Sequence, residues 1–221
     1  MTREYAQFCG LARALELVGG RWTLLIVRDL LAGPKRFTEL QEGLPGIPTN
    51  ILSSRLRELE EAGLVRRSLL ARPSSAVAYE LTPYGLELEE ALVRLGLWGS
   101  RSLGEPKKGD FFPLGSFALA LKSAFRAERA KDHDFLFQIR IDGERLNVCV
   151  DQGQVSFPKE PSTEPDAALE MAPEVMVELL PGRLTVDSAI ASGQVRVDGS
   201  KREARRFFDI FRLPSRAYAR E

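Results

Sequence analysis

The sequence has very few of the residues from which metal centres and disulfide frameworks are built. It contains two cysteines, Cys9 and Cys149, and one histidine in 221 residues. Two cysteines that lie this far apart argue against a disulfide framework and against a cysteine-based metal cluster. We therefore expect no metal site and no cofactor.

Long hydrophobic runs are also missing. No apolar stretch reaches the roughly 18 residues of a membrane-spanning helix, and the first residues, MTREYAQFCG, lack the basic-then-apolar layout of a signal peptide. The hydrophobic content of 44% and the charged content of 28% are typical of a globular chain that buries a core. We expect a cytoplasmic protein without a membrane partner.

An excess of one charge is the third absence, since 31 lysines and arginines balance 31 aspartates and glutamates. Nucleic-acid-binding proteins usually carry a positive excess. Any DNA-binding surface in this chain must therefore arise from where the charges are placed.

One segment, SLGEPKKGDFFPLGS at residues 102–116, combines glycine, proline and two lysines between two long periodic regions. This composition is typical of a linker. We predict a first domain at residues 1–104, a linker at 105–110 and a second domain at 111–221. The first domain has the pattern of short helices, then two strands joined around Arg72, then one long helix at residues 84–103. The second has a helix at residues 111–130, an antiparallel meander, and further helices, so the fold class is α+β.

The segment TNILSSRLRELEE, residues 49–61, carries leucines at helical spacing, with Thr49 as the expected N-cap. At 100° per residue, a helix that buries Leu52 turns Asn50, Ser54 and Arg57 away from the core, with Ser53 at the side. Small polar side chains at the amino end allow close approach to a DNA groove, and asparagine suits adenine. The alternative is an ordinary solvated helix face that begins with capping residues.

The surrounding order of elements is that of a winged helix-turn-helix. The segments CGLARALELVGGRWTLLIVRDLLAGPKRFTEL, LPGIPTNILSSRLRELEEAGLVRR and YELTPYGLEL resemble the HxlR-type family of bacterial transcriptional regulators over about residues 9–100. The resemblance implies a homodimer that pairs through the first helix and residues 86–98 and binds a pseudo-palindrome in double-stranded DNA. It implies a DNA-binding set of Lys35, Arg36, Thr49, Asn50, Ser53, Ser54, Arg57 and Arg72.

Cys9 lies at the start of the first predicted helix. In several members of the family that this chain resembles, a cysteine there senses oxidants, although the family often has Cys-Pro where this chain has Cys9-Gly10. A helix amino end stabilises a thiolate. The alternative is a small residue buried at the dimer seam.

No catalytic pattern appears in the second half. His133 has no serine or cysteine at a readable spacing, and phosphate loops, zinc spacings and paired carboxylates are missing. We expect no enzyme.

Phenylalanines concentrate in the second half, and LLPGRLTVDSAIASGQVRVDG resembles the sterol carrier protein type-two family, over about residues 112–212. The resemblance implies an apolar tunnel between a sheet and helices. Its expected wall residues are Met171, Met176, Leu179, Leu180, Ile190 and Phe211. The alternative is a filled core, because a sheet covered by helices needs the same residues.

The sequence thus predicts a DNA-binding transcriptional regulator whose second domain binds a hydrophobic small-molecule effector. Two alternatives stay open. One is a carrier of hydrophobic ligands, and the other is a regulator whose second domain serves only dimerisation or partner binding.

Overall fold

The computed structural model describes residues 4–69, 76–107, 109–131, 133–161 and 163–214. The chain folds into two compact units, one up to Leu92 and one from Val93 onward. Helices and a sheet occur together, so the expected α+β class is confirmed. No helix among the described residues is long and apolar enough to cross a bilayer.

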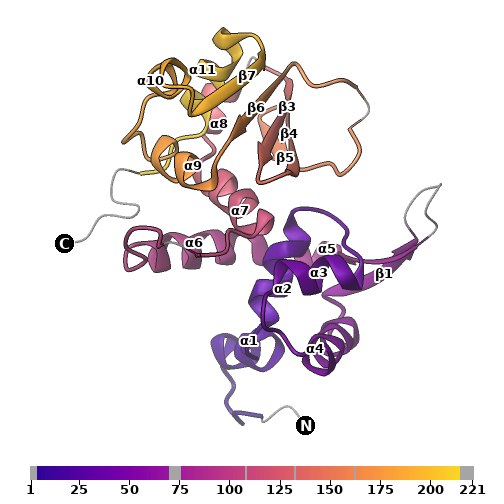
Figure 1. The fold of residues 1–221 in the computed structure, drawn as a ribbon. Helices are drawn as coiled ribbons and strands as arrows, with labels where there is room; N and C mark the ends of the chain where they lie inside the picture. Colours follow the sequence, from indigo (N-terminus) through magenta and orange to yellow (C-terminus); the bar gives the residue numbers. More distant parts are fainter. Residues whose placement is uncertain (1–3, 70–75, 108, 132, 162, 215–221) are drawn as a thin grey trace. The chain divides into compact units, whose positions relative to one another are not determined.

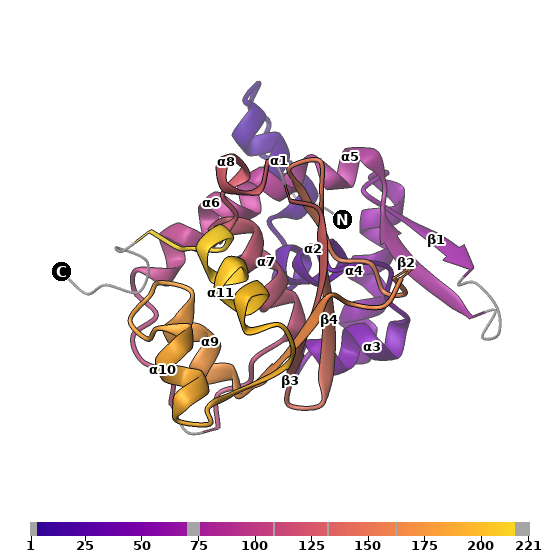
Figure 2. The same ribbon diagram turned by 90° about the horizontal axis from the view of Figure 1, so that it is seen from above.

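The N-terminal unit is a bundle of short helices followed by a β-hairpin (Figure 1). Its elements are α1 (Gly10–Val18), α2 (Thr23–Leu31), α3 (Phe37–Gly43), α4 (Thr49–Glu61), β1 (Val65–Leu69), β2 (Val77–Leu81) and α5 (Pro83–Leu86), followed by the start of α6 (Leu88–Ser100), which runs on into the second unit after Leu92. β1 and β2 pair antiparallel from Val65↔Leu81 to Leu69↔Val77. The hairpin projects from the helices in both ribbon views (Figures 1 and 2), as the wing of a winged helix does.

The expected single helix at residues 84–103 was wrong, because the chain forms α5 and α6 with a break at Glu87. Thr82 caps α5, since its Oγ1 accepts a hydrogen bond from the Gly85 backbone N–H at 3.1 Å. A Cβ atom on Gly85 would lie 2.1 Å from the Leu64 carbonyl oxygen. α5 is therefore held against the connection between α4 and β1.

The C-terminal unit is a five-stranded sheet with helices on one face (Figure 1). The sheet is mixed, and not antiparallel throughout as was expected, because β3 (Phe135–Ile141) and β6 (Ala167–Met171) pair parallel. Its strands are β3 (Phe135–Ile141), β4 (Glu144–Asp151), β5 (Gln154–Ser156), β6 (Ala167–Met171) and β7 (Val195–Gly199), in the order β5-β4-β3-β6-β7. Its helices are α7 (Leu114–Ala124), α8 (Ala127–Ala130), α9 (Pro173–Leu179), α10 (Val186–Ala191) and α11 (Lys201–Ile210).

The predicted meander is confirmed, with turns at Asp142-Gly143 and Gln152-Gly153 whose backbones have positive φ. The predicted helix at residues 111–130 was too long. The chain leaves the helix at Phe125, which has extended backbone angles and forms an isolated bridge with Phe211. This non-local pairing divides the segment into α7 and α8.

A buried carboxylate lies in the core of the N-terminal unit. Asp29 of α2 is 1% exposed, and its Oδ1 accepts a hydrogen bond from Arg28 Nε at 3.0 Å. Its Oδ2 has no hydrogen-bond partner among the described residues. Burial raises the pKa of Asp29 above its ordinary value of 3.8, and the charges of Arg28 and Lys35 oppose this rise.

We predict that this carboxylate makes the N-terminal unit less stable as the pH rises. The folded state binds the Asp29 proton more tightly than the unfolded state does. The stabilisation that the protonated Asp29 contributes to the folded state is therefore complete below pH 3.8. It is lost as the pH rises through the raised pKa. Asp29→Asn should flatten this decline, whose slope is at most about 1.4 kcal/mol per pH unit.

Urea unfolding of wild type and Asp29→Asn over a pH series measures the difference. Trp98→Phe in both proteins leaves Trp22 as the single tryptophan, so that its fluorescence follows the N-terminal unit. Parallel stability curves for the two proteins would contradict the prediction.

Candidate nucleic-acid interface

The amino end of α4 begins one residue earlier than expected. Pro48, with φ −67° and ψ 140°, is the N-cap, and Thr49 is already the first helical residue. The Pro48 carbonyl accepts hydrogen bonds from the N–H groups of Ile51 and Leu52, each at 3.0 Å. Thr49 was therefore wrongly expected as the N-cap, and its side chain is not used to close the helix.

The leucines of α4 fix which side chains point outward. Leu52, Leu56 and Leu59 are at most 1% exposed, as their spacing predicts. Asn50 and Arg57 are exposed, in agreement with the helical projection, whereas Ser54, which was also expected to point away from the core, is half-buried. The opposite faces of α4 are thus a buried leucine stripe and an open polar surface.

Some polar side chains at the amino end of α4 form hydrogen bonds within the described part of the protein, and Asn50 does not. Thr49 Oγ1 accepts from Gln41 Nε2 at 2.9 Å, and the exposed Ser53 donates to the Thr49 carbonyl at 2.9 Å. Ser54 is half-buried and donates to Glu58 at 3.0 Å. Asn50 makes no side-chain hydrogen bond within the described chain, so its amide is open to a ligand.

The acids of α4 are each paired with an arginine. Glu58 binds Arg55, Glu60 accepts from Arg67 Nε at 3.0 Å, and Glu61 lies 3.9 Å from Arg57 Nε. The last pair is fully at the surface, with both side chains 69% exposed, and such pairs are weak. Arg57 can therefore leave Glu61 for a stronger anion such as a phosphate.

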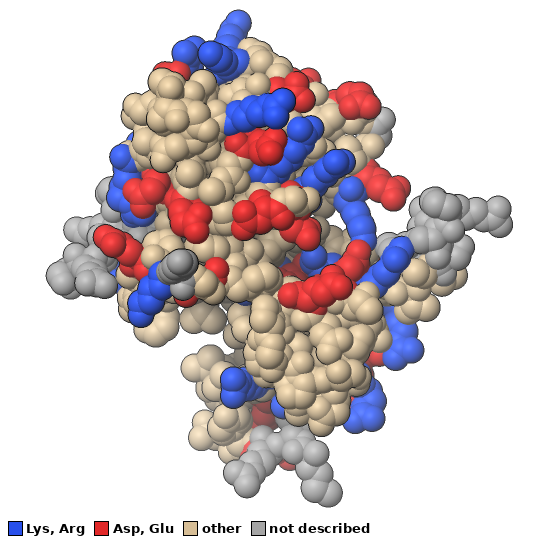
Figure 3. All heavy atoms as spheres, viewed as in Figure 1, with Lys and Arg blue, Asp and Glu red and all other residues tan. Residues whose placement is uncertain are grey.

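On the face drawn in Figure 3, basic and acidic side chains of the described residues are interspersed, with no extended patch of one charge. The first turn of α4 contains no acidic residue. The positive end of the helix dipole is consequently not compensated by a carboxylate of its own helix.

Lys35 and Arg36 lie at the entrance to α3, and both are half-buried. The backbone of Lys35 bridges to Tyr79 of β2, with N···O distances of 3.0 and 2.8 Å. The backbone N–H of Arg36 donates to Glu39 at 2.6 Å, whereas its side-chain Nε is buried and has no hydrogen-bond partner among the residues that the structure describes. These contacts join the base of the wing to the start of the helix-turn-helix.

The arginines of the wing strand are engaged in ion pairs. Arg66 Nε lies 2.8 Å from Glu80, and Arg67 binds Glu60 and lies over the ring of Tyr79 at 5.6 Å. Arg72, the expected wing contact, lies outside the described residues.

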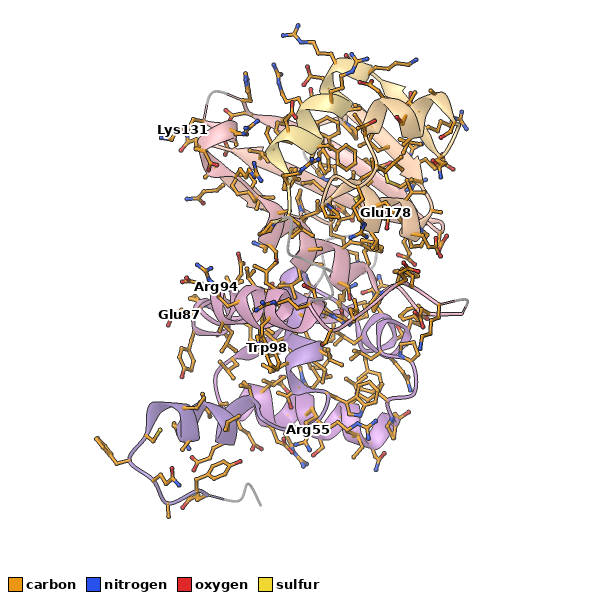
Figure 4. The ribbon with its side chains drawn as sticks, turned by 90° about the vertical axis from the view of Figure 1, so that its left-hand side faces the viewer. Arg55, Glu87, Arg94, Trp98, Lys131 and Glu178 are labelled. Carbon is orange, nitrogen blue, oxygen red and sulfur yellow. The ribbon has the colours of Figure 1, made fainter. Side chains whose placement is uncertain are left out.

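Two positioning residues did not emerge from the sequence. Gln41 links α3 to Thr49 across eight residues, and Arg55 (labelled in Figure 4) lies against the turn after α1. A Cβ atom on Gly20 would be 2.9 Å from Arg55 Cζ, which the flexible arginine could relieve, whereas one on Gly19 would lie 2.4 Å from the backbone carbonyl oxygen of Leu15. The Gly19-Gly20 pair was the available signal, because a second glycine after a helix end indicates a close approach.

Apolar side chains remain exposed on two helices. Leu11 and Leu15 of α1 are 70% and 45% exposed, and Leu95 and Trp98 of α6 (Figure 4) are 48% and 71% exposed. Cys9, the residue before α1, is also exposed and makes no capping hydrogen bond. Exposed apolar side chains in such number on one helix favour an interface.

The expected tunnel residues lie in the core of the C-terminal unit. Most are at most 5% exposed, and Ile190 is half-buried; the buried ones are Met171, Met176, Leu179, Leu180 and Phe211. Around them phenylalanine rings touch in sequence: the centroids of Phe137 and Phe207 are 5.1 Å apart, and those of Phe207 and Phe211 are 4.5 Å apart. These residues and rings therefore belong to the core of the unit, and whether they line an apolar tunnel stays a prediction.

Among the described residues no cluster of three or more histidine, cysteine, aspartate or glutamate side chains could hold a metal ion.

Two family descriptions match the chain in tandem. The HxlR-like helix-turn-helix family matches residues 17–107, and the SCP-2 sterol transfer family matches residues 117–212. Both resemblances inferred from the sequence are thereby confirmed.

The relatives are similar to the N-terminal part. An uncharacterised HTH-type transcriptional regulator of Mycobacterium bovis is 47% identical over 95 residues, which are 43% of this chain and 60% of that protein. The chain thus spans less than two thirds of that relative. The uncharacterised HTH-type regulator YtcD of Bacillus subtilis is 38% identical over 89 residues, 40% of this chain and 71% of YtcD. A crystal structure of the regulator ytcD has a TM-score of 0.40 at 35% identity and covers 43% of this chain and 98% of that one.

Proposed function

We propose that this chain, which belongs to the HxlR-like helix-turn-helix family, is a transcriptional regulator that binds double-stranded operator DNA through the amino end of α4. The observation that carries this proposal is the combination of a buried leucine stripe, an open Asn50 and an acid-free first turn on one helix. We further propose that it works in the cytoplasm and catalyses no reaction.

The side chains at this end divide by their chemistry into two roles. Asn50 is the candidate for base recognition, because its amide can donate to and accept from adenine at once. Lys35, Arg36 and Arg57 are candidates for phosphates, which fix position without sequence preference. Thr49, Ser53 and Ser54 would allow close approach, and Arg72 is proposed to contact DNA from the wing.

Replacing Asn50 by alanine should weaken binding to the preferred sequence by about 1–3 kcal/mol and relax preference at one base pair. Arg57→Ala should weaken binding to all sequences alike and lower the salt slope by about 1. The measurement is fluorescence anisotropy with duplexes selected by the wild-type protein from a random pool, at several salt concentrations.

Gln154→Ala, an exposed amide on β5, is the matched control and should bind as the wild type does. If Asn50→Ala retained full affinity and base preference, α4 would not be the recognition helix.

We propose that the chain forms a homodimer through α1 and α6. The exposed leucines and Trp98 of these helices would be covered by a second copy, and two recognition helices would then contact a pseudo-palindromic site. A symmetric dimer of this kind uses the same patch on both subunits.

Leu11→Asp should shift the protein to monomers, because it places a charge in an apolar interface. Leu69→Asp is the matched control, since Leu69 of the wing is 74% exposed and Leu11 is 70% exposed. Sedimentation velocity over a concentration series measures the change. Equal dimer fractions for both variants would exclude α1 from the interface.

Cys9 is proposed as an oxidant-sensing residue next to this interface. Its exposure before α1 would let oxidation alter the pairing of α1. In the anisotropy assay, a response to peroxide that persists in Cys9→Ser would contradict this role.

We also propose that the C-terminal unit binds a hydrophobic small molecule at Met171, Met176, Leu179, Leu180, Ile190 and Phe211 and thereby alters DNA affinity. The support is the match to the sterol transfer family together with the apolar character of these residues. The alternatives are a carrier of hydrophobic ligands and a partner-binding module.

Bound hydrophobic ligand should be visible by native mass spectrometry of the intact protein. An effector should change the Kd for the selected duplex by about 5–150-fold. Bound ligand without any change in Kd would indicate the carrier, and a protein that takes up no ligand would indicate the partner-binding module.

A further inference from the structure

The outer face of the C-terminal sheet carries a row of charged residues on four adjacent strands. Arg145 of β4 pairs with Arg140 of β3, Arg140 with Glu170 of β6, and Glu170 with Arg196 of β7. The neighbouring residues Ile139 and Leu169 point into the core, so alternation places this row on the face opposite the helices.

The two arginines at one end of this row are placed unfavourably. Arg140 and Arg145 are direct cross-strand partners, and like charges directly opposite destabilise a sheet. Arg140 has a weak surface contact with Asp198, at 3.9 Å. In the described part of the chain Arg145 and Arg196 have no ion-pair partner, although both are exposed.

Arg140 is also held in place. Its Nε donates to Gln138 Oε1 at 2.8 Å, and Gln138 Nε2 donates to Asn147 at 3.2 Å. Asn147 is buried and donates to the carbonyls of Pro158 and Lys159 at 3.0 and 3.1 Å. The loop after β5 therefore braces the guanidinium group of Arg140 through two amide side chains.

The row of charged residues, together with the turn between β3 and β4, lines a groove of about 540 Å³. The three arginines line it together with Glu170, Asp142 and Gln194. The volume suits a small molecule rather than a lone ion. The groove presents three guanidinium groups against two carboxylates.

From this arrangement we infer that the groove binds a small polar molecule that carries a phosphate or carboxylate group. Its oxyanion would lie between Arg140 and Arg145, where guanidinium groups bind such anions in bidentate fashion and the anion removes their repulsion. Hydroxyl or amino groups of the same molecule would face Glu170. The charged groups of this site lie on the outer face of the sheet; it shares only Met171 with the proposed apolar site, and it does not depend on DNA binding.

The test is an NMR titration of the full chain with sodium phosphate and, separately, with sodium citrate, at an ionic strength held constant with sodium chloride. We expect saturable shifts of the backbone amides of Gly143, Arg145 and Gln194. The probe that binds more tightly assigns the anion as phosphate or carboxylate.

Two variants are expected to change the affinity in opposite directions. Loss of folding would weaken binding in both, so it cannot produce this result. Arg145→Gln should weaken binding about tenfold or more, and Glu170→Gln, which removes a negative charge from the groove, should tighten it. Arg202→Gln, an exposed arginine of α11, is the matched control and should leave the affinity unchanged. Shifts that do not saturate with either probe, or equal affinities in all four proteins, would overturn the inference.

Discussion

The burial of three leucines of α4 is the constraint on which the N-terminal unit depends. Each fully buried leucine contributes about 1.5–3 kcal/mol, so the three together approach the total stability of a small domain, about 5–15 kcal/mol. A shift of one residue would rotate the helix by 100° and expose Leu52. The leucines therefore determine that Asn50 faces outward, and no contact of Asn50 itself is needed for its placement.

A second constraint follows from the balanced charge of the chain. Since arginine and lysine are not in excess, a surface for anions requires that acids be occupied elsewhere. α4 meets this requirement because its three acids are paired with Arg55, Arg57 and Arg67. On the outer sheet face the arginines are instead left open, because Arg145 and Arg196 have no ion-pair partner among the described residues.

The spacing of apolar residues was sufficient to predict the helices and strands whose buried residues follow that spacing. The leucine stripe of α4 and the alternation of β3 and β4 could be predicted because each depends on neighbours along the chain. The helix breaks at Glu87 and Phe125 could not be predicted from the spacing of apolar residues. The first accompanies the close approach of Gly85 to Leu64 and the second a bridge to Phe211, and both contacts join residues far apart in sequence. The pairing of Arg140 with Arg145 could be read from the predicted hairpin, whereas Glu170 and Arg196 joined them only through strand order.

The packing of the C-terminal unit bears on how it could respond to a ligand. A ligand shifts a conformational equilibrium only by its difference in affinity for the two states. An apolar molecule that entered between the Phe137, Phe207 and Phe211 rings would have to separate them, so part of its binding energy would be spent on opening these contacts. An oxyanion in the outer groove needs no such opening, because the guanidinium groups already face the solvent. It would act instead by relieving a repulsion between β3 and β4, which tightens the sheet. The two proposed sites would therefore differ in cost, because only the apolar ligand would spend binding energy on opening packed contacts, whereas either ligand would stabilise the folded unit by binding to it.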